Sequence, residues 1–187
     1  RSYITISNPR RRWGLPPVDE GTALWGIVGA NALVFVGWHV APPRFMYNHF
    51  TCSEHNLSQL RVHTLLTAAF SHQDFGHFAT NMLGFYFFGQ ELARLLGGQR
   101  LLGLYLAAGV VGSVCHIAYH RFNGPRHRRG LLFQAPAGLG ASGAVNGVVL
   151  LNVLLYPSRT IYLNFFIPMP AALLGVLFVL RDFSGLY

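Results

Sequence analysis

Residues 71–82 read SHQDFGHFATNM and open an apolar stretch that runs from about Phe75 to Leu96. His77 and Asn81 are four positions apart in this stretch, so a helix places both side chains on one face. An imidazole and an amide directed at the same point can donate hydrogen bonds to an oxyanion. A single pair of this kind also forms ordinary hydrogen bonds between helices, and taken alone it favours that interpretation.

A second polar position lies near the start of a later apolar stretch, where residues 140–143 read GASG. Glycines on both sides of Ser142 remove steric cover, so a backbone or a substrate can come close to the hydroxyl. A serine in a membrane helix also bonds back to a carbonyl one turn earlier, and GASG alone is therefore weak evidence for catalysis. The motif differs from the GxSxG turn of hydrolases, because Ala144 stands at its last position.

The composition is that of a membrane protein. Of the 187 residues, 52% are hydrophobic and only 11% are charged, whereas soluble domains carry about a quarter charged residues. The net charge is +8, and arginine supplies all 14 basic side chains. Short basic loops of this kind indicate contact with anionic lipid headgroups. The chain has no basic helix interleaved with aromatic residues, so binding to nucleic acid is not expected.

The apolar residues gather in five stretches, at residues 23–40, 75–96, 101–119, 139–156 and 161–180. We expect an all-α, polytopic membrane protein with five spans. Pro168 and Pro170 should kink the last helix or delay its start. Residues 41–71 are long enough for short interfacial helices, and residues 120–129 predict a basic hairpin. The 14 arginines divide equally between the two sides of such a bundle, so the positive-inside rule sets no orientation.

The two cysteines, Cys52 and Cys115, provide neither a disulfide framework nor a CxxC metal site. They allow one bridge at most. Two small apolar side chains are the better interpretation.

Taken together, the polar motifs resemble the rhomboid family of intramembrane serine proteases. SHQDFGHFATNM resembles the second-helix signature of that family, and GASG resembles its GxSG nucleophile motif. The continuation of the second helix and the start of the next also match, at residues 88–91 (FGQE), Gly98, Arg100 and Tyr105. The resemblance covers roughly residues 31–159 and implies a rhomboid-like helical bundle.

The resemblance also implies roles for the polar residues. Ser142 would be the nucleophile that attacks a peptide carbonyl of a transmembrane protein substrate. His77 and Asn81 would donate to the oxyanion, together with the backbone N–H of Ser142. Residues 41–71 would be the membrane-embedded first loop of the family. No cofactor and no metal is implied.

The sequence departs from the family pattern at the general base. Rhomboid proteases pair the serine with a histidine on a sixth helix, and nothing that resembles this motif precedes Tyr187. A serine hydroxyl is a poor nucleophile without a base. No sequence motif predicts that His116 or His120 lies near Ser142. We therefore expect a basic N-terminal segment, residues 1–20, and a rhomboid-like transmembrane domain, residues 21–187, that lacks the sixth helix at its C-terminus.

Two smaller departures concern side chains that the family uses for packing. Asn146 stands where many members carry a bulky aromatic residue one turn after the nucleophile. The Trp-Arg pair of the first loop reads Leu60-Arg61. Both changes would be tolerated in a protein that no longer catalyses.

Two functions remain open. One is an intramembrane serine endopeptidase whose histidine lies outside the given sequence. The other is a catalytically inactive, rhomboid-like structural or binding subunit of a larger organellar membrane complex. In that case Gly140, Gly143 and Gly147 would form a groove with no internal partner, and a neighbouring subunit would pack there. A transporter is poorly supported, because no inverted repeat is visible.

The N-terminal region bears on location. Arg10, Arg11 and Arg12 precede the first acidic residue, Asp19, which is typical of organellar targeting regions and also of basic segments that flank a membrane span. We expect an integral protein of the mitochondrial inner membrane, with a bacterial plasma membrane as the alternative.

Overall fold

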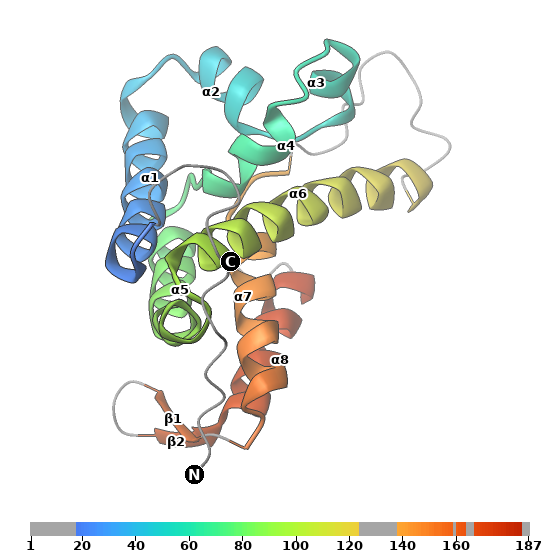
Figure 1. Ribbon diagram of the computed structural model, residues 1–187. Helices are drawn as coiled ribbons and strands as arrows, with labels where there is room; N and C mark the ends of the chain where they lie inside the picture. The colour runs from blue at the N-terminus through green and yellow to red at the C-terminus, as the bar shows by residue number, and fades with distance from the viewer. Residues whose placement is uncertain (1–17, 124–137, 159, 164–166, 185–187) are drawn as a thin grey trace.

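The computed structural model describes residues 18–123, 138–158, 160–163 and 167–184, and these residues form a helical bundle (Figure 1). Five helices overlap the five expected apolar stretches: α1 (Glu20–Val40), α5 (Phe75–Leu96), α6 (Gly98–Asn123), α7 (Ser142–Leu155) and α8 (Ala171–Ser184). The all-α fold class is confirmed. Among the described residues, α1 and α6 are long and apolar enough to cross a bilayer, and α7 is a shorter apolar helix.

Local sequence signals set several helix ends. The side chain of Asp19 accepts a hydrogen bond of 2.8 Å from the backbone N–H of Thr22 and caps α1. Asp74 caps α5 in the same way, by accepting from the N–H of His77 at 2.9 Å. Gly97, at φ +86°, then ends α5 and separates it from α6. The expected bounds of α5 are therefore confirmed at both ends.

The last apolar stretch begins with strands. β1 (Thr160–Leu163) and β2 (Ile167–Pro170) pair in antiparallel register, and α8 starts directly after Pro170. The prolines thus delay the helix, as expected, but the hairpin was not predicted. The predicted basic hairpin at residues 120–129 lies largely outside the described residues, as does most of the basic segment at residues 1–20; α6 continues to Asn123.

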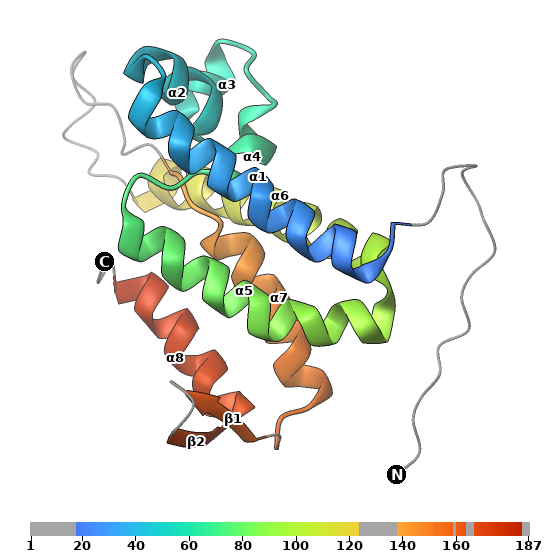
Figure 2. The ribbon, with the colours of Figure 1, turned by 90° about the vertical axis from the view of Figure 1, so that its left-hand side faces the viewer.

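The connection between α1 and α5, residues 41–71, contains the expected short helices. They are α2 (Pro43–Phe50), α3 (Glu54–Ser58), α4 (Thr64–Thr67) and the 3-10 turn η1 (Ala68–Phe70). Arg61 holds this connection together by donating to the side-chain oxygens of Asn48 and Asn56, each at 2.9 Å. Figure 2 shows α2 and α3 gathered at one end of the bundle, beyond the C-terminal end of α1.

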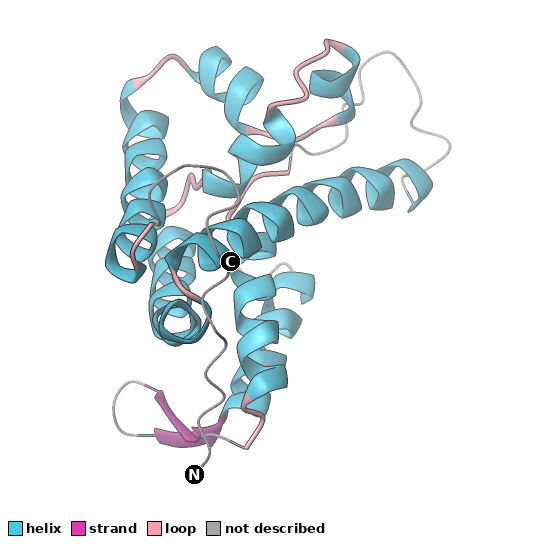
Figure 3. Cartoon of the chain, viewed as in Figure 1, coloured by secondary structure: helices cyan, strands magenta, loops and turns pink. Residues whose placement is uncertain are grey.

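The helix α7 packs against α5, α6 and α8, and α1 covers α5 and α6 (Figures 1 and 2). Figure 3 shows that the small β-hairpin lies at the far end of α7 from the connection. A buried chain of hydrogen bonds joins three of these parts. The amide of Asn31 on α1 donates to the Tyr105 hydroxyl on α6 at 2.9 Å, and that hydroxyl donates to the Ala69 carbonyl at 2.9 Å. The connection is therefore tied into the bundle.

The glycine face of α7 is filled by α6. A Cβ placed on Gly143 would lie 3.2 Å from the Cα of Gly112, and one placed on Gly147 would lie 2.5 Å from the Cβ of Ala108. The expectation of a groove at Gly140, Gly143 and Gly147 with no internal partner is therefore wrong. Small residues of α6 meet Gly143 and Gly147, which lets the two backbones approach closely, and His77 of α5 lies against Gly140.

This close packing predicts that Gly147→Ala destabilises the bundle, because the new methyl group would force α6 and α7 apart. We expect the free energy of unfolding to fall by about 1–3 kcal/mol. The measurement is thermal or denaturant unfolding in detergent micelles. Gly26→Ala on α1 is the matched control, since a Cβ there meets nothing within 4 Å. Equal stability of the two variants would contradict this account of the interface.

Candidate functional site

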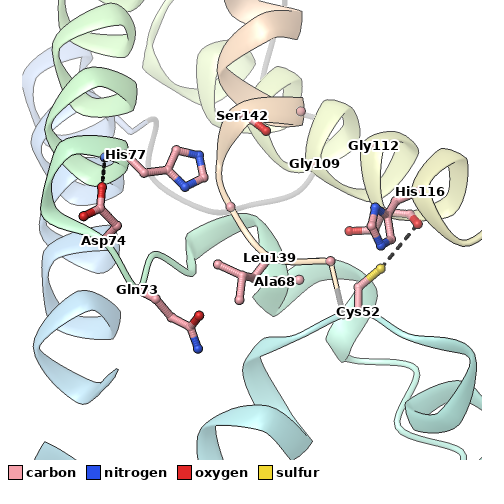
Figure 4. A pocket seen from close by; sticks show the side chains of 14 residues that line it. Cys52, Ala68, Gln73, Asp74, His77, Gly109, Gly112, His116, Leu139 and Ser142 are labelled. Carbon is pink, nitrogen blue, oxygen red and sulfur yellow. Dashed lines mark hydrogen bonds between the residues drawn. The ribbon is translucent and has the colours of Figure 1, made fainter. Parts of the chain in front are cut away.

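A cavity of about 530 Å³ lies where α5, α6, α7 and the connection meet. It is lined on one side by the first turn of α5 and on another by the glycine-rich part of α6. The start of α7 and the residues before it form a further wall, and Cys52 and Ala68 come from the connection. Figure 4 shows the polar side chains that surround this space, among them His77, His116 and Ser142.

Ser142 occupies the first position of α7 and is partly buried at the cavity. The N–H groups in the first turn of a helix have no acceptor within that helix, and they carry the positive end of its dipole. Ser142 therefore brings together a hydroxyl that can act as a nucleophile and a backbone N–H that can donate to a developing negative charge. GASG places both at the mouth of a helix, as the sequence indicated.

His77 lines the same cavity from the first turn of α5 and is buried. Its ring lies against the backbone of Gly140, where a Cβ would come within 2.8 Å of the ring atom Cε1. Gly140 has φ +128°, a conformation that side chains rarely adopt. Figure 4 shows the His77 ring reaching into the cavity from α5, with Ser142 on the facing helix. The structure thus brings together two of the three predicted site residues.

Asn81 is placed differently. It lies one turn beyond His77 on α5 and is buried, and it does not belong to the residues that line the cavity. Its Nδ2 lies 3.2 Å from Nε2 of His72, which precedes α5. Asn81 is therefore linked to the site through His72, whose ring meets that of His77, and it does not line the cavity.

His116 lines the cavity as well, from α6 on the side opposite His77 (Figure 4). Its ring packs on Gly138, where a Cβ would lie 2.5 Å from Cδ2. No sequence motif placed His116 near Ser142. A signal was available, because His116 follows Gly112 by four positions and so shares the helix face on which α6 meets α7.

Cys52 completes this side of the cavity. Its backbone exchanges two hydrogen bonds with Gly138, at 2.7 and 2.8 Å, and its Sγ donates to the Ser113 carbonyl at 3.4 Å. Burial raises the pKa of the Cys52 thiol to about 11, so the thiolate is scarce at neutral pH. Between Cys52 and Ser142, Ser142 is therefore the better candidate to attack a carbonyl.

Both cysteines are free, with Cys52 buried and Cys115 exposed on α6. The interpretation of two unbridged side chains is confirmed. Within the part of the chain that the structure describes, no three His, Cys, Asp or Glu side chains gather into a group that could hold a metal ion.

Comparisons with known proteins identify the family of the chain. Residues 59–187 match the Rhomboid domain family. The chain is 45% identical to RHOMBOID-like protein 12, mitochondrial, of Arabidopsis thaliana over 180 residues, which is 92% of this chain and 54% of that protein. It is 36% identical to Rhomboid-like protein 16, chloroplastic, of the same plant, over 79% of this chain and 48% of the relative.

A fungal relative is more distant. Rhomboid protein 1, mitochondrial, of Saccharomyces cerevisiae is 32% identical over 148 residues, which is 79% of this chain and 40% of that protein. The chain spans about half the length of the curated relatives it matches.

The contact between Gly140 and His77 predicts that Gly140→Ala disturbs the cavity. The methyl group would collide with the imidazole, and the backbone conformation is strained for alanine, so we expect a loss of about 1–3 kcal/mol in the free energy of unfolding. The measurement is unfolding in detergent, with Gly103→Ala on α6 as the control because a Cβ there has nothing within 4 Å. A Gly140→Ala variant as stable as this control would disprove the contact.

Proposed function

The chain belongs to the rhomboid family, and from this premise we propose that the cavity is the site of an intramembrane serine endopeptidase with Ser142 as its nucleophile. The observation that carries the proposal is the meeting of Ser142 and His77 in one cavity, with the Gly140 backbone between them. Ser142 would attack a peptide carbonyl of a transmembrane protein substrate. Its position at the start of α7 supports this role, because the adjacent N–H can stabilise the oxyanion that forms.

His77 would supply a second hydrogen bond to the oxyanion from the wall that faces α7. Donors that are fixed before the reaction stabilise the transition state without reorganising, and removing one donor typically costs about 10²–10³-fold in rate. The ring of His77 lies against the Gly140 backbone and meets the His72 ring edge-on, and both contacts restrain it. We propose Asn81 as the third donor, through the amide N–H that His72 does not engage.

The reaction also needs a general base for the Ser142 hydroxyl. We propose that the full-length protein supplies the histidine that rhomboid proteases carry on a sixth helix. His116 stands in the same cavity and is the competing candidate within this sequence. The two possibilities predict different effects of His116→Ala on the rate of substrate cleavage.

The alternative function is a catalytically inactive rhomboid-like subunit of a larger membrane complex. Asn146 and Leu60, which replace an aromatic residue and a tryptophan of the family pattern, favour it. Because α6 fills the glycine face of α7, a partner in such a complex would bind another surface, such as the outer faces of α1 and α6.

We further propose a mitochondrial location, in the inner membrane. The plant and yeast relatives with mitochondrial names support the organelle, while a chloroplastic relative makes the plastid membrane the main competitor. The apolar helices α1 and α6 support residence in the bilayer. The arginines that flank them suit anionic headgroups. Fractionation of organelles that carry the tagged full-length protein separates these locations.

The protease proposal predicts that Ser142→Ala abolishes cleavage of a transmembrane substrate by the full-length protein in liposomes. We expect kcat/KM to fall by at least about 10³-fold, as when nucleophiles are removed from other serine proteases. Ser113→Ala is the matched control, because Ser113 lines the same cavity from α6; it should change the rate by less than about threefold. A fluorophosphonate reagent should label the wild type and Ser113→Ala, and leave Ser142→Ala unlabelled.

His116→Ala, measured in the same assay, identifies the base. Cleavage within about tenfold of the wild type assigns the base to another helix, and loss comparable to Ser142→Ala assigns it to His116. A full-length wild type that neither cleaves nor reacts with the fluorophosphonate would support the inactive subunit.

A further inference from the structure

His72 is a fully buried polar side chain in contact with both predicted oxyanion donors. It lies between η1 and α5, at 0% exposure. Its Nε2 is 3.2 Å from Nδ2 of Asn81. Its ring meets that of His77 edge-on, with centroids 5.1 Å apart and an angle of 77° between the planes. The proposed roles of Ser142, His77 and Asn81 do not include this residue.

The hydrogen bond to Asn81 sets the protonation that His72 needs. An amide Nδ2 carries only donors, so Nε2 must be an unprotonated acceptor and the single ring proton must sit on Nδ1. Burial lowers the pKa of His72 to about 3, and the neighbouring His77 adds to this effect. His72 lies between η1 and α5, outside the membrane-spanning helices, and is neutral in the physiological range. The acceptor state is therefore the stable one.

The other ring nitrogen argues against a purely structural role. Nδ1 of His72 is buried and has no hydrogen-bond partner among the described residues. Leaving a buried donor unpaired costs about 1–3 kcal/mol, and most buried polar atoms in native proteins are paired. An apolar side chain would fill this space at lower cost. The hydrogen bond to Asn81 is thus the feature that explains the presence of His72.

The amide of Asn81 has two N–H groups, and one of them is engaged by His72. The bond prevents the amide from turning over, so that the second N–H keeps a fixed direction. The edge-on contact restrains the His77 ring at the same time. We propose that His72 is a positioning residue that fixes Asn81 and His77 as oxyanion donors without touching the substrate. This inference rests on the proposed function of those two residues.

Steady-state kinetics of the full-length protein in liposomes test the role. His72→Leu should lower kcat by at least about tenfold and change KM by less than about twofold, because donor geometry matters most in the transition state. His72→Gln retains an acceptor and should recover a substantial part of kcat. His55→Leu, at an exposed histidine of α3, is the control and should behave as the wild type.

The double variant sharpens this test. If His72 acts through Asn81, then His72→Leu should add less than about threefold to the loss already caused by Asn81→Ala. Fully multiplicative losses, a change in KM alone, or an unchanged rate in a folded His72→Leu variant would each overturn the proposal.

Nitrogen NMR of the ¹⁵N-histidine-labelled protein in micelles tests the contacts without relying on activity. His72 should show the tautomer with its proton on Nδ1 and should not titrate between about pH 8 and pH 5. Asn81→Ala should shift its Nε2 resonance, while the exposed His55 stays unchanged. A proton on Nε2 of His72, or an Nε2 resonance that does not shift in Asn81→Ala, would overturn the positioning role. If the wild type fails to cleave while these shifts appear, the protease proposal fails and the contact stands.

Discussion

The close approach of α6 and α7 is the constraint on which the site depends. Gly112 and Gly143 let the two backbones meet, with a Cβ on either glycine only 3.1–3.2 Å from the Cα of the other. Ser142 precedes Gly143 directly, so this crossing fixes where the hydroxyl sits. His116 lies one turn beyond Gly112 on α6, so the same crossing of α6 and α7 places it at the cavity. A side chain at the crossing would move the candidate nucleophile and the cavity wall together.

Much of this arrangement could be predicted where the signal is local. The bounds of α5 follow from the Asp74 cap and from Gly97, both of which act within one turn. Ser142 and His77 are recognisable because their motifs, taken together and in this order, resemble those of the rhomboid family. The hairpin before α8 was missed, since a short apolar run does not distinguish a strand from a helix.

What could not be predicted are the contacts between distant segments. A stripe of glycines on α7 indicates close packing but does not identify the partner, and α6 proved to be that partner. The place of His116 in the cavity and the bond between His72 and Asn81 depend on the same long-range assembly. The role of Asn81 was predicted from its spacing to His77 together with the family resemblance, and neither could tell whether its amide lines the cavity or contacts another histidine instead.

The backbone link between Cys52 and Gly138 has a mechanical consequence. These two hydrogen bonds attach the connection to the segment that leads into α7. A third bond, from the Gly140 N–H to the Ala68 carbonyl at 3.1 Å, strengthens this attachment. A molecule that displaces the connection therefore also displaces Gly138 and Gly140, just before Ser142. Access to the cavity and the alignment of Ser142 are therefore coupled through the main chain. Opening the cavity also disturbs the alignment of Ser142.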